Sequence, residues 1–258
     1  MATVILARHG RTTANASGVL AGRGKGVHLD EHGLEQARAA GQRLAGLPLA
    51  AIVTSPLERC KETAREISRL QPTALRVAGE RGLLECDYGS WTGRELKSLA
   101  KEKLWQTVQA HPSNAHFPEG ESMAAMMARS VAAIRAWDAE VEAEHGADAV
   151  WLAVSHGDVI KSVLADALGM HLDLFQRIVV EPASLSVVRY TPLRPFVVSV
   201  NSSSGDLSGL KPPARRRRRK LDSDAVVGGS TGTTAVDPVD PVDSMAAGAA
   251  RAPGAGKT

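Results

Sequence analysis

Two apolar runs of this 258-residue chain end in the same dipeptide, His-Gly. The first run, 4–7, leads to His9, and the second, 150–154, leads to His156. A short, continuous apolar run is typical of a buried parallel strand, and open α/β sheets assemble their ligand sites at the carboxyl ends of such strands. The pattern therefore predicts two strands that bring two histidines to one pocket.

Strand-like and helix-like segments alternate along most of the chain. The strands are predicted at 4–8, 48–54, 75–78 and 149–155, with a closing hairpin from 185–190 and 195–200. The helices are predicted at 33–44, 56–70, 95–108, 121–145 and 159–168. This alternation predicts an α/β fold with a mostly parallel sheet.

The helix predicted at 56–70 begins with a capping sequence. Ser55 is placed to cap the helix, Pro56 suits its first position and Glu58 suits its third. This arrangement puts Arg59 in the first turn, beside the end of the preceding strand.

Charge divides the chain at about residue 201. Residues 1–201 hold 22 Lys and Arg against 22 Asp and Glu, whereas residues 202–258 hold 9 against 6. Because 202–258 lack aromatic residues and are rich in Gly, Pro, Ser and Ala, we expect a disordered tail there. The tail contains the basic run 215–220, which should attract polyanions in a salt-sensitive way without specific nucleic-acid recognition.

The two cysteines, Cys60 and Cys86, lack the spacing of a zinc or redox motif. No stretch approaches the roughly 18 apolar residues of a membrane span, and the first residues lack a signal-peptide pattern. We therefore expect a cytoplasmic protein with no membrane segment. Its oligomeric state stays open, with a dimer among the alternatives.

The predicted strand ends gather side chains suited to phosphoryl transfer. Arg8 and Arg59 offer forked donors that match phosphate oxygens, His9 and His156 can attack or donate, and Glu85 can move protons. The chain thus offers a candidate for each role in the reaction: the nucleophile, the neutralisation of charge and the protonation of the leaving group. The inventory indicates transfer through a covalent phosphohistidine.

Two alternatives remain within this chemistry. His9 and His156 with Asp158 could belong to a metal-dependent phosphoesterase, but two-metal sites need several carboxylates, and these strand ends carry Arg and His. We therefore expect no metal ion and no other cofactor. For the acid, Asp87 competes with Glu85 because it lies only two residues away.

A series of short motifs, in order along residues 3–200, resembles the histidine phosphatase superfamily, the phosphoglycerate mutase-like family. They are Arg8-His9-Gly10-Arg11-Thr12 with Asn15, Gly22-Arg23, Ser55-Pro56-Leu57-Glu58-Arg59, Glu85 with Tyr88-Gly89, the segment 117–122, and Ser155-His156-Gly157. The resemblance implies a phosphoglycerate mutase-like domain over residues 1–201, with three α/β/α layers.

The same resemblance implies roles for single residues. His9 would be the nucleophile and Glu85 the proton donor to the leaving group. Arg8, Arg59 and His156 would hold the phosphoryl oxygens. The further phosphate contacts expected are Gly10, Thr12, Asn15, Gly22 and Gly157.

Three functions stay open. The leading one is a phosphatase that hydrolyses a small phosphomonoester through phosphohistidine on His9. The second is a phosphoglycerate mutase-like phosphomutase, but mutases of this family carry an insertion with Tyr and paired Arg, whereas 92–116 holds no Tyr and only Arg94. That difference favours hydrolysis. The third is a non-catalytic protein that binds polyanions through 215–220.

The substrate is not specified by these motifs, because the fold supplies the reaction class and leaves the substrate open. The loops 18–29 and 88–118, with Trp91 and Trp105, are expected to shape the choice.

Overall fold

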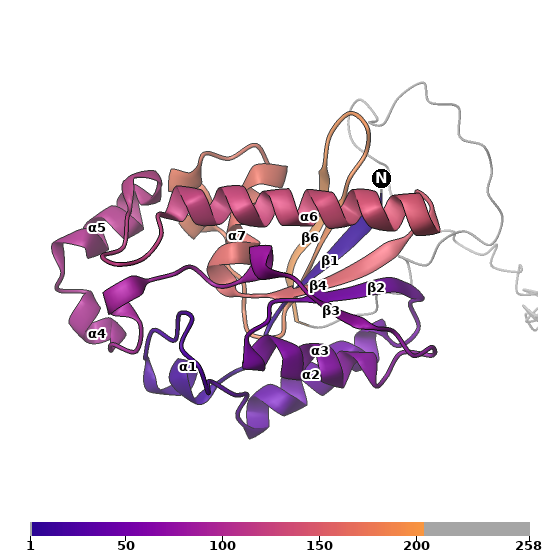
Figure 1. The fold of residues 1–258 in the computed structure, drawn as a ribbon, viewed down its shortest axis with the longest axis horizontal. Coiled ribbons are helices and arrows are strands. Elements are labelled where there is room, and N and C mark those ends of the chain that lie inside the picture. Colours follow the sequence, from indigo (N-terminus) through magenta and orange to yellow (C-terminus); the bar gives the residue numbers. More distant parts are fainter. Residues whose placement is uncertain (1, 204–258) are drawn as a thin grey trace, which may run out of the picture. The chain divides into compact units, whose positions relative to one another are not determined.

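The structure is a computed structural model that describes residues 2–203. At its centre is a six-stranded sheet in the order β3-β2-β4-β1-β5-β6 (Figure 1). The strands are β1 Thr3–Arg8, β2 Leu49–Thr54, β3 Val77–Gly79, β4 Val150–Ser155, β5 Leu185–Arg189 and β6 Phe196–Ser202. The first four pair in parallel, and β5 and β6 add antiparallel pairs at one side. The predicted α/β class and the closing hairpin are confirmed.

Helices cover both faces of the sheet, with α2 and α3 on one and α6 and α7 on the other (Figure 1). The helices are α1 Thr13–Ser17, α2 Glu31–Leu44, α3 Glu58–Ser68, α4 Leu96–Leu99, α5 Lys103–Ala110, α6 Met123–His145 and α7 Gly157–Ala167. Short 3-10 helices are η1 Arg81–Leu83, η2 Gly89–Trp91, η3 Pro112–Asn114 and η4 Leu172–Arg177. The fold has three layers.

The alternation of side chains along β1 explains why both faces are covered. Val4 and Leu6 point into the core beneath α6 and α7, whereas Ile5 and Ala7 point into the core beneath α2 and α3. Successive residues of a strand face opposite sides, so a strand that is apolar at every position needs a layer on each side.

The carboxyl ends of β1, β4 and β2 lie side by side. Arg8 pairs with Ser155 across β1 and β4, and the His9 backbone N–H donates to the Ser155 carbonyl at 3.0 Å. The Ser55 backbone N–H donates to the Val154 carbonyl at 2.9 Å. The next side chains of three strands therefore meet at one edge of the sheet.

The single helix predicted at 95–108 is wrong, because the chain forms α4 and α5 with a turn between them. Leu99 and Val108 are both buried in the same core. In one continuous helix they would be about 2.5 turns apart, on opposite faces, so the break lets both side chains reach that core.

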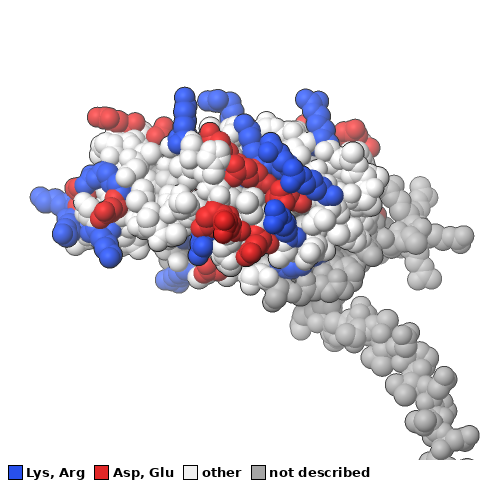
Figure 2. All heavy atoms as spheres, turned by 90° about the horizontal axis from the view of Figure 1, so that it is seen from below, with Lys and Arg blue, Asp and Glu red and all other residues white. Residues whose placement is uncertain are grey.

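The face that carries α2 and α3 shows basic and acidic side chains next to one another (Figure 2). Arg38 of α2 and Glu66 of α3 form one such pair, at 3.0 Å. This fits the balanced charge of residues 1–201. None of the helices in residues 2–203 is long and apolar enough to cross a bilayer. The predicted tail 202–258 starts one residue too early, because Ser202 belongs to β6. Residues 204–258, with the basic run 215–220, lie outside the described residues.

Candidate active site

His9 and His156 follow β1 and β4 and face each other, with ring centroids 5.3 Å apart at an angle of 62°. Parallel pairing of the two strands in register causes this, because each histidine is the first residue after its strand. The expectation that the two imidazoles lie together is confirmed, but only His9 lines the cavity described below.

His9 presents one ring nitrogen without a proton. Its Nδ1 lies 2.8 Å from the Gly10 carbonyl oxygen, which can only accept, so Nδ1 carries the proton. Its Nε2 accepts from Nε of Arg59 at 3.3 Å. Burial, then Arg59 and Arg8, lower the pKa of His9 well below its usual range. The ring is neutral near pH 7, and its unprotonated Nε2 accepts the Arg59 hydrogen bond, which a bond to phosphorus would replace.

Arg59 lies in the first turn of α3, as predicted, and is 1% exposed. Its Nη2 donates to the Gly22 carbonyl at 2.8 Å and to His156 Nδ1 at 3.2 Å. Arg8 donates from Nη1 to the Val180 carbonyl at 2.6 Å. Nη1 of Arg59 and Nε of Arg8 are buried, and neither has a hydrogen-bond partner among the described residues. Buried donors of this kind suit an anion.

The predicted cap of the helix after β2 is wrong. The helix α3 begins at Glu58 with Leu57 as N-cap and no side-chain cap. Ser55 instead places its Oγ 2.8 Å from Nε2 of His156. Because β2 lies directly beside β4, the Ser55 hydroxyl reaches across the strand ends and binds the His156 ring instead of capping α3.

His156 is fully buried and sits behind the guanidinium of Arg59. Arg59 can only donate, so Nδ1 of His156 accepts, and Nε2 carries the proton toward Ser55. Burial, then Arg59 and His9, lower the pKa of His156 well below its usual range. In this arrangement the imidazole fixes the orientation of Arg59.

Glu85 belongs to the irregular segment between η1 and η2 and lines the same cavity as His9. It was expected at the end of a strand, but β3 ends earlier, at Gly79. Its Oε1 accepts from the Cys86 backbone N–H at 2.9 Å. Burial, then the Asp158 carboxylate, raise the pKa of Glu85 to about 7 against the opposing effect of Arg59.

The alternative acid, Asp87, has other partners. Its carboxylate pairs with Arg23 at 3.3 Å and accepts from the Gly89 backbone N–H at 3.1 Å. It does not line the cavity that holds His9 and Glu85.

Three charged residues, Arg23, Arg129 and Glu121, form a cluster that holds the main chain of Glu85. Arg23 and Arg129 donate to its carbonyl oxygen at 2.8 and 3.0 Å. Both also bind Glu121, at 2.8 and 2.6 Å. Arg23 and Glu121 lie in the sequence motifs, whereas Arg129 on α6 gave no sequence signal because only the tertiary fold brings it to this loop.

The cavity has a volume of about 360 Å³. Among the predicted contacts, Arg8, His9, Asn15, Gly22, Arg59, Glu85 and Gly157 line it. Gly10, Thr12 and His156 do not. The Gly10 N–H donates to Thr63 Oγ1 at 3.1 Å, and Thr12 caps α1 through the Asn15 N–H at 3.1 Å. In this structure Gly10 and Thr12 therefore support the loop rather than face the cavity.

The loops 18–29 and 88–118 contribute Val19, Leu20 and Leu96 to the cavity lining, as expected. Sequence reasoning missed the rest of its outer part. Asp158 and Lys161 on α7, Gln176 on η4 and the segment 178–180 all line it. Trp91 and Trp105, which were expected to select substrate, do not line it and stack on each other with centroids 6.2 Å apart.

The model of the histidine phosphatase superfamily, branch 1, matches residues 4–203. The chain belongs to the histidine phosphatase superfamily. A curated relative from Yersinia enterocolitica, named "Probable phosphoglycerate mutase GpmB", is 33% identical to this histidine phosphatase over 218 residues, which are 83% of this chain and 97% of the relative.

Solved structures of the superfamily resemble the fold. The alpha-ribazole phosphatase from Shigella flexneri has 25% identity and a TM-score of 0.67, covering 78% of this chain and 97% of that one. The mycobacterial glucosyl-3-phosphoglycerate phosphatase has 24% identity and a TM-score of 0.69, covering 78% and 98%. At that identity the second likeness concerns the fold alone.

Proposed function

We propose that this histidine phosphatase hydrolyses a small phosphomonoester through a covalent phosphohistidine on His9. One observation carries the proposal. The unprotonated Nε2 of His9 lies against Arg59, whose buried Nη1 has no partner in the described residues. A nucleophile and an unsatisfied donor in the same place suit a transferring phosphoryl group.

In the first step, the lone pair of His9 Nε2 forms a bond to phosphorus as the bond from phosphorus to the alcohol oxygen breaks. The Glu85 carboxyl gives its proton to that oxygen, and its raised pKa keeps the proton available near neutral pH. Arg8 and Arg59 neutralise the charge on the phosphoryl oxygens, while Gly157, the first residue of α7, adds a backbone N–H.

In the second step, the Glu85 carboxylate takes a proton from water. The water oxygen bonds to phosphorus and the bond from phosphorus to Nε2 breaks, which releases inorganic phosphate and restores His9. His156 contributes by holding Arg59 at 3.2 Å. Because Arg8 and Arg59 supply the positive charge, we propose that the reaction needs no metal ion, so activity should survive excess EDTA.

A phosphomutase is the second candidate, favoured by the name of the Yersinia relative. A mutase must bind the part of its substrate outside the phosphoryl group while that group moves to a second hydroxyl. Arg94, the arginine of 92–116, instead pairs with Glu102 at 2.7 Å and does not line the cavity. This arrangement supports hydrolysis.

The test is a panel of phosphomonoesters scored for released phosphate, with a mutase assay on 3-phosphoglycerate alongside. His9→Ala should abolish turnover and the acid-labile labelling of the protein by radioactive substrate. His32→Ala, on α2, should leave both unchanged. Labelling that persists in His9→Ala would remove the mechanism, and transfer between hydroxyls without phosphate release would favour the mutase.

We propose the cytoplasm as the compartment. Cys60 and Cys86 are both buried and free, which fits a reducing environment.

A further inference from the structure

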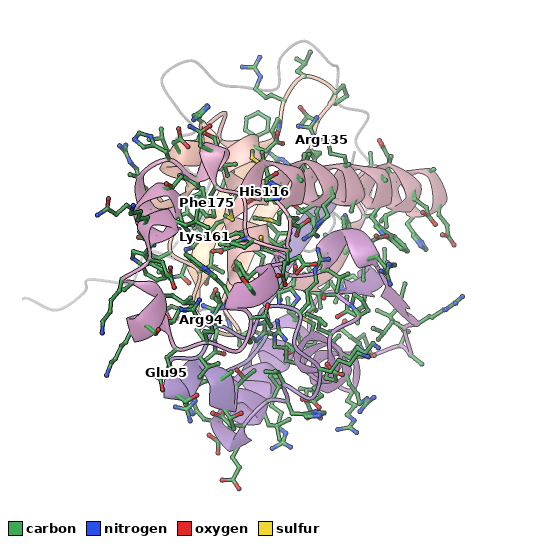
Figure 3. The ribbon with its side chains drawn as sticks, turned by 60° about the vertical axis from the view of Figure 1, so that its left-hand side comes forward. Arg94, Glu95, His116, Arg135, Lys161 and Phe175 are labelled. Atoms are coloured by element: carbon green, nitrogen blue, oxygen red, sulfur yellow. The ribbon has the colours of Figure 1, made fainter. Side chains whose placement is uncertain are left out.

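Two opposite charges of α7 meet in the outer part of the cavity. Asp158 and Lys161 lie one turn apart on the helix, with 3.7 Å between Oδ1 and Nζ. Lys161 also donates to Oε1 of Gln176 at 3.1 Å and lies over the ring of Phe175, 5.5 Å from its centroid (Figure 3). The ammonium group is held from three sides.

Asp158 in turn has two partners. Besides Lys161, it accepts a hydrogen bond from the Tyr88 hydroxyl at 2.8 Å. Both charged side chains are about four-fifths buried, with 20% and 22% of their surface exposed. The two opposite charges lie close enough to offset each other in this part of the cavity.

Lys161 is the only Lys or Arg other than Arg8 and Arg59 among the described residues that line the cavity. Arg8 and Arg59 lie at the inner end, beside His9. With Glu85 protonated, the outer part therefore carries no net charge. A second anionic group on a substrate would meet Asp158 and a lysine already committed to it.

Another part of the cavity lining is apolar. Val19 and Leu20 line the cavity from the loop after α1, together with Leu96. This loop is bound to the start of α4, since the Leu20 N–H donates to the Arg94 carbonyl at 3.0 Å and the Leu96 N–H to the Gly18 carbonyl at 2.9 Å. Ile178 and Val179 add apolar surface from the segment after η4.

We propose that the Asp158–Lys161 pair determines specificity, selecting phosphate esters of neutral, hydroxylated alcohols and rejecting alcohols that carry a second anion. The inference rests on the proposed phosphatase activity. Asp158, Lys161 and Gln176 offer acceptors and donors to hydroxyl groups, and the apolar wall takes the carbon face of the alcohol. Asp158 acts by occupying the lysine that would otherwise bind a carboxylate.

The test compares glycerol 3-phosphate with 3-phosphoglycerate, which have the same chain length but differ in one carboxylate. The wild-type protein should prefer glycerol 3-phosphate in kcat/KM by about tenfold or more. Asp158→Asn should free Lys161 and shift this ratio toward 3-phosphoglycerate by about tenfold. Any effect on Glu85 cancels in the ratio, because both esters release a similar alkoxide.

Two further variants make the result specific. Adding Lys161→Met to Asp158→Asn should remove the gain for 3-phosphoglycerate, because no cation is left to bind its carboxylate. Asp166→Asn, on the same helix but paired with Arg135 at 2.7 Å, should leave the ratio unchanged.

A wild-type preference for 3-phosphoglycerate would overturn the inference, as would a gain in Asp158→Asn that survives the loss of Lys161. Either result leaves the proposed function standing if turnover still depends on His9. Failure of the proposed function looks different, because then neither ester is hydrolysed.

Discussion

Nε of Arg59 lies 3.3 Å from Nε2 of His9, so the side chain proposed to bind the phosphoryl group contacts the proposed nucleophile directly. The same guanidinium reaches His156 Nδ1 at 3.2 Å. One planar group therefore contacts both imidazoles, and its third nitrogen, Nη1, is buried with no hydrogen-bond partner among the described residues, which suits the proposed phosphoryl group. The ammonium group of a lysine is a compact point charge and lacks the planar, forked set of donors that the guanidinium has.

Arg59→Lys should lower kcat/KM by about 100-fold, because it loses two or more charge-assisted hydrogen bonds. The measurement is steady-state hydrolysis of the best substrate from the panel, with circular dichroism to verify folding. Arg65→Lys, farther along α3, serves as the matched control and should stay near wild type. A folded Arg59→Lys protein with nearly full activity would contradict the role of the fork.

The pH dependence of kcat/KM for an alkyl phosphate should be bell-shaped. Activity needs His9 without its second proton, and its pKa lies well below 6.5, so the acid limb falls only at low pH. Activity also needs Glu85 protonated, so it should decline as pH rises through about 7. Initial rates across the pH range check both limbs.

Glu85→Gln should slow alkyl phosphates by about 100-fold or more and remove the alkaline limb. An aryl phosphate should be affected far less in its first step, because its phenolate leaves without a proton. Asp87→Asn tests the competing acid and should keep the alkaline limb. If Asp87→Asn loses that limb and Glu85→Gln retains it, the two acids exchange roles.

Arg129→Met should act through position rather than contact with substrate, since Arg129 binds the Glu85 carbonyl. The expected result is a roughly tenfold lower kcat for an alkyl ester, with a smaller loss for an aryl ester. Arg135→Met, on the same helix, should reduce neither. Equal losses for both esters would indicate a general structural defect instead.

Gly10→Ala should destabilise the fold. A Cβ at Gly10 would lie 2.3 Å from the Gly33 carbonyl oxygen of α2, and backbone cannot move aside easily. We expect the free energy of unfolding in urea to fall by about 2 kcal/mol. Gly79→Ala, with nothing within 4 Å of its Cβ, should change it by less than about 1 kcal/mol. Similar values for both variants would refute the close approach.

The inner half of the site could be predicted from sequence because its residues follow strands that are easy to recognise. His9 and His156 end apolar runs, and parallel pairing then brings them together. The place of Arg59 could be predicted from the approximate position of the next helix alone. The helix start was misplaced, and Ser55 was assigned to it, because the sequence does not show that β2 lies beside β4.

The outer half could not be predicted in the same way. Lys161 and Gln176 meet only because η4 packs against α7, and neither residue type identifies a cavity by itself. Arg129 likewise joins a distant loop through its side chain. Such contacts depend on tertiary packing, which leaves no periodic pattern in the sequence.

Most residues of the inner and outer parts of the cavity come from different segments, although α7 and the loop after α1 contribute to both. The residues proposed to act on the phosphoryl group follow adjacent strand ends or begin α3 and α7, and Glu85 comes from the segment between η1 and η2. The groups around the alcohol come from the loop after α1, one face of α7 and the segment after η4. Substitutions in these segments can therefore change which alcohol is accepted while the residues proposed for phosphoryl transfer stay the same.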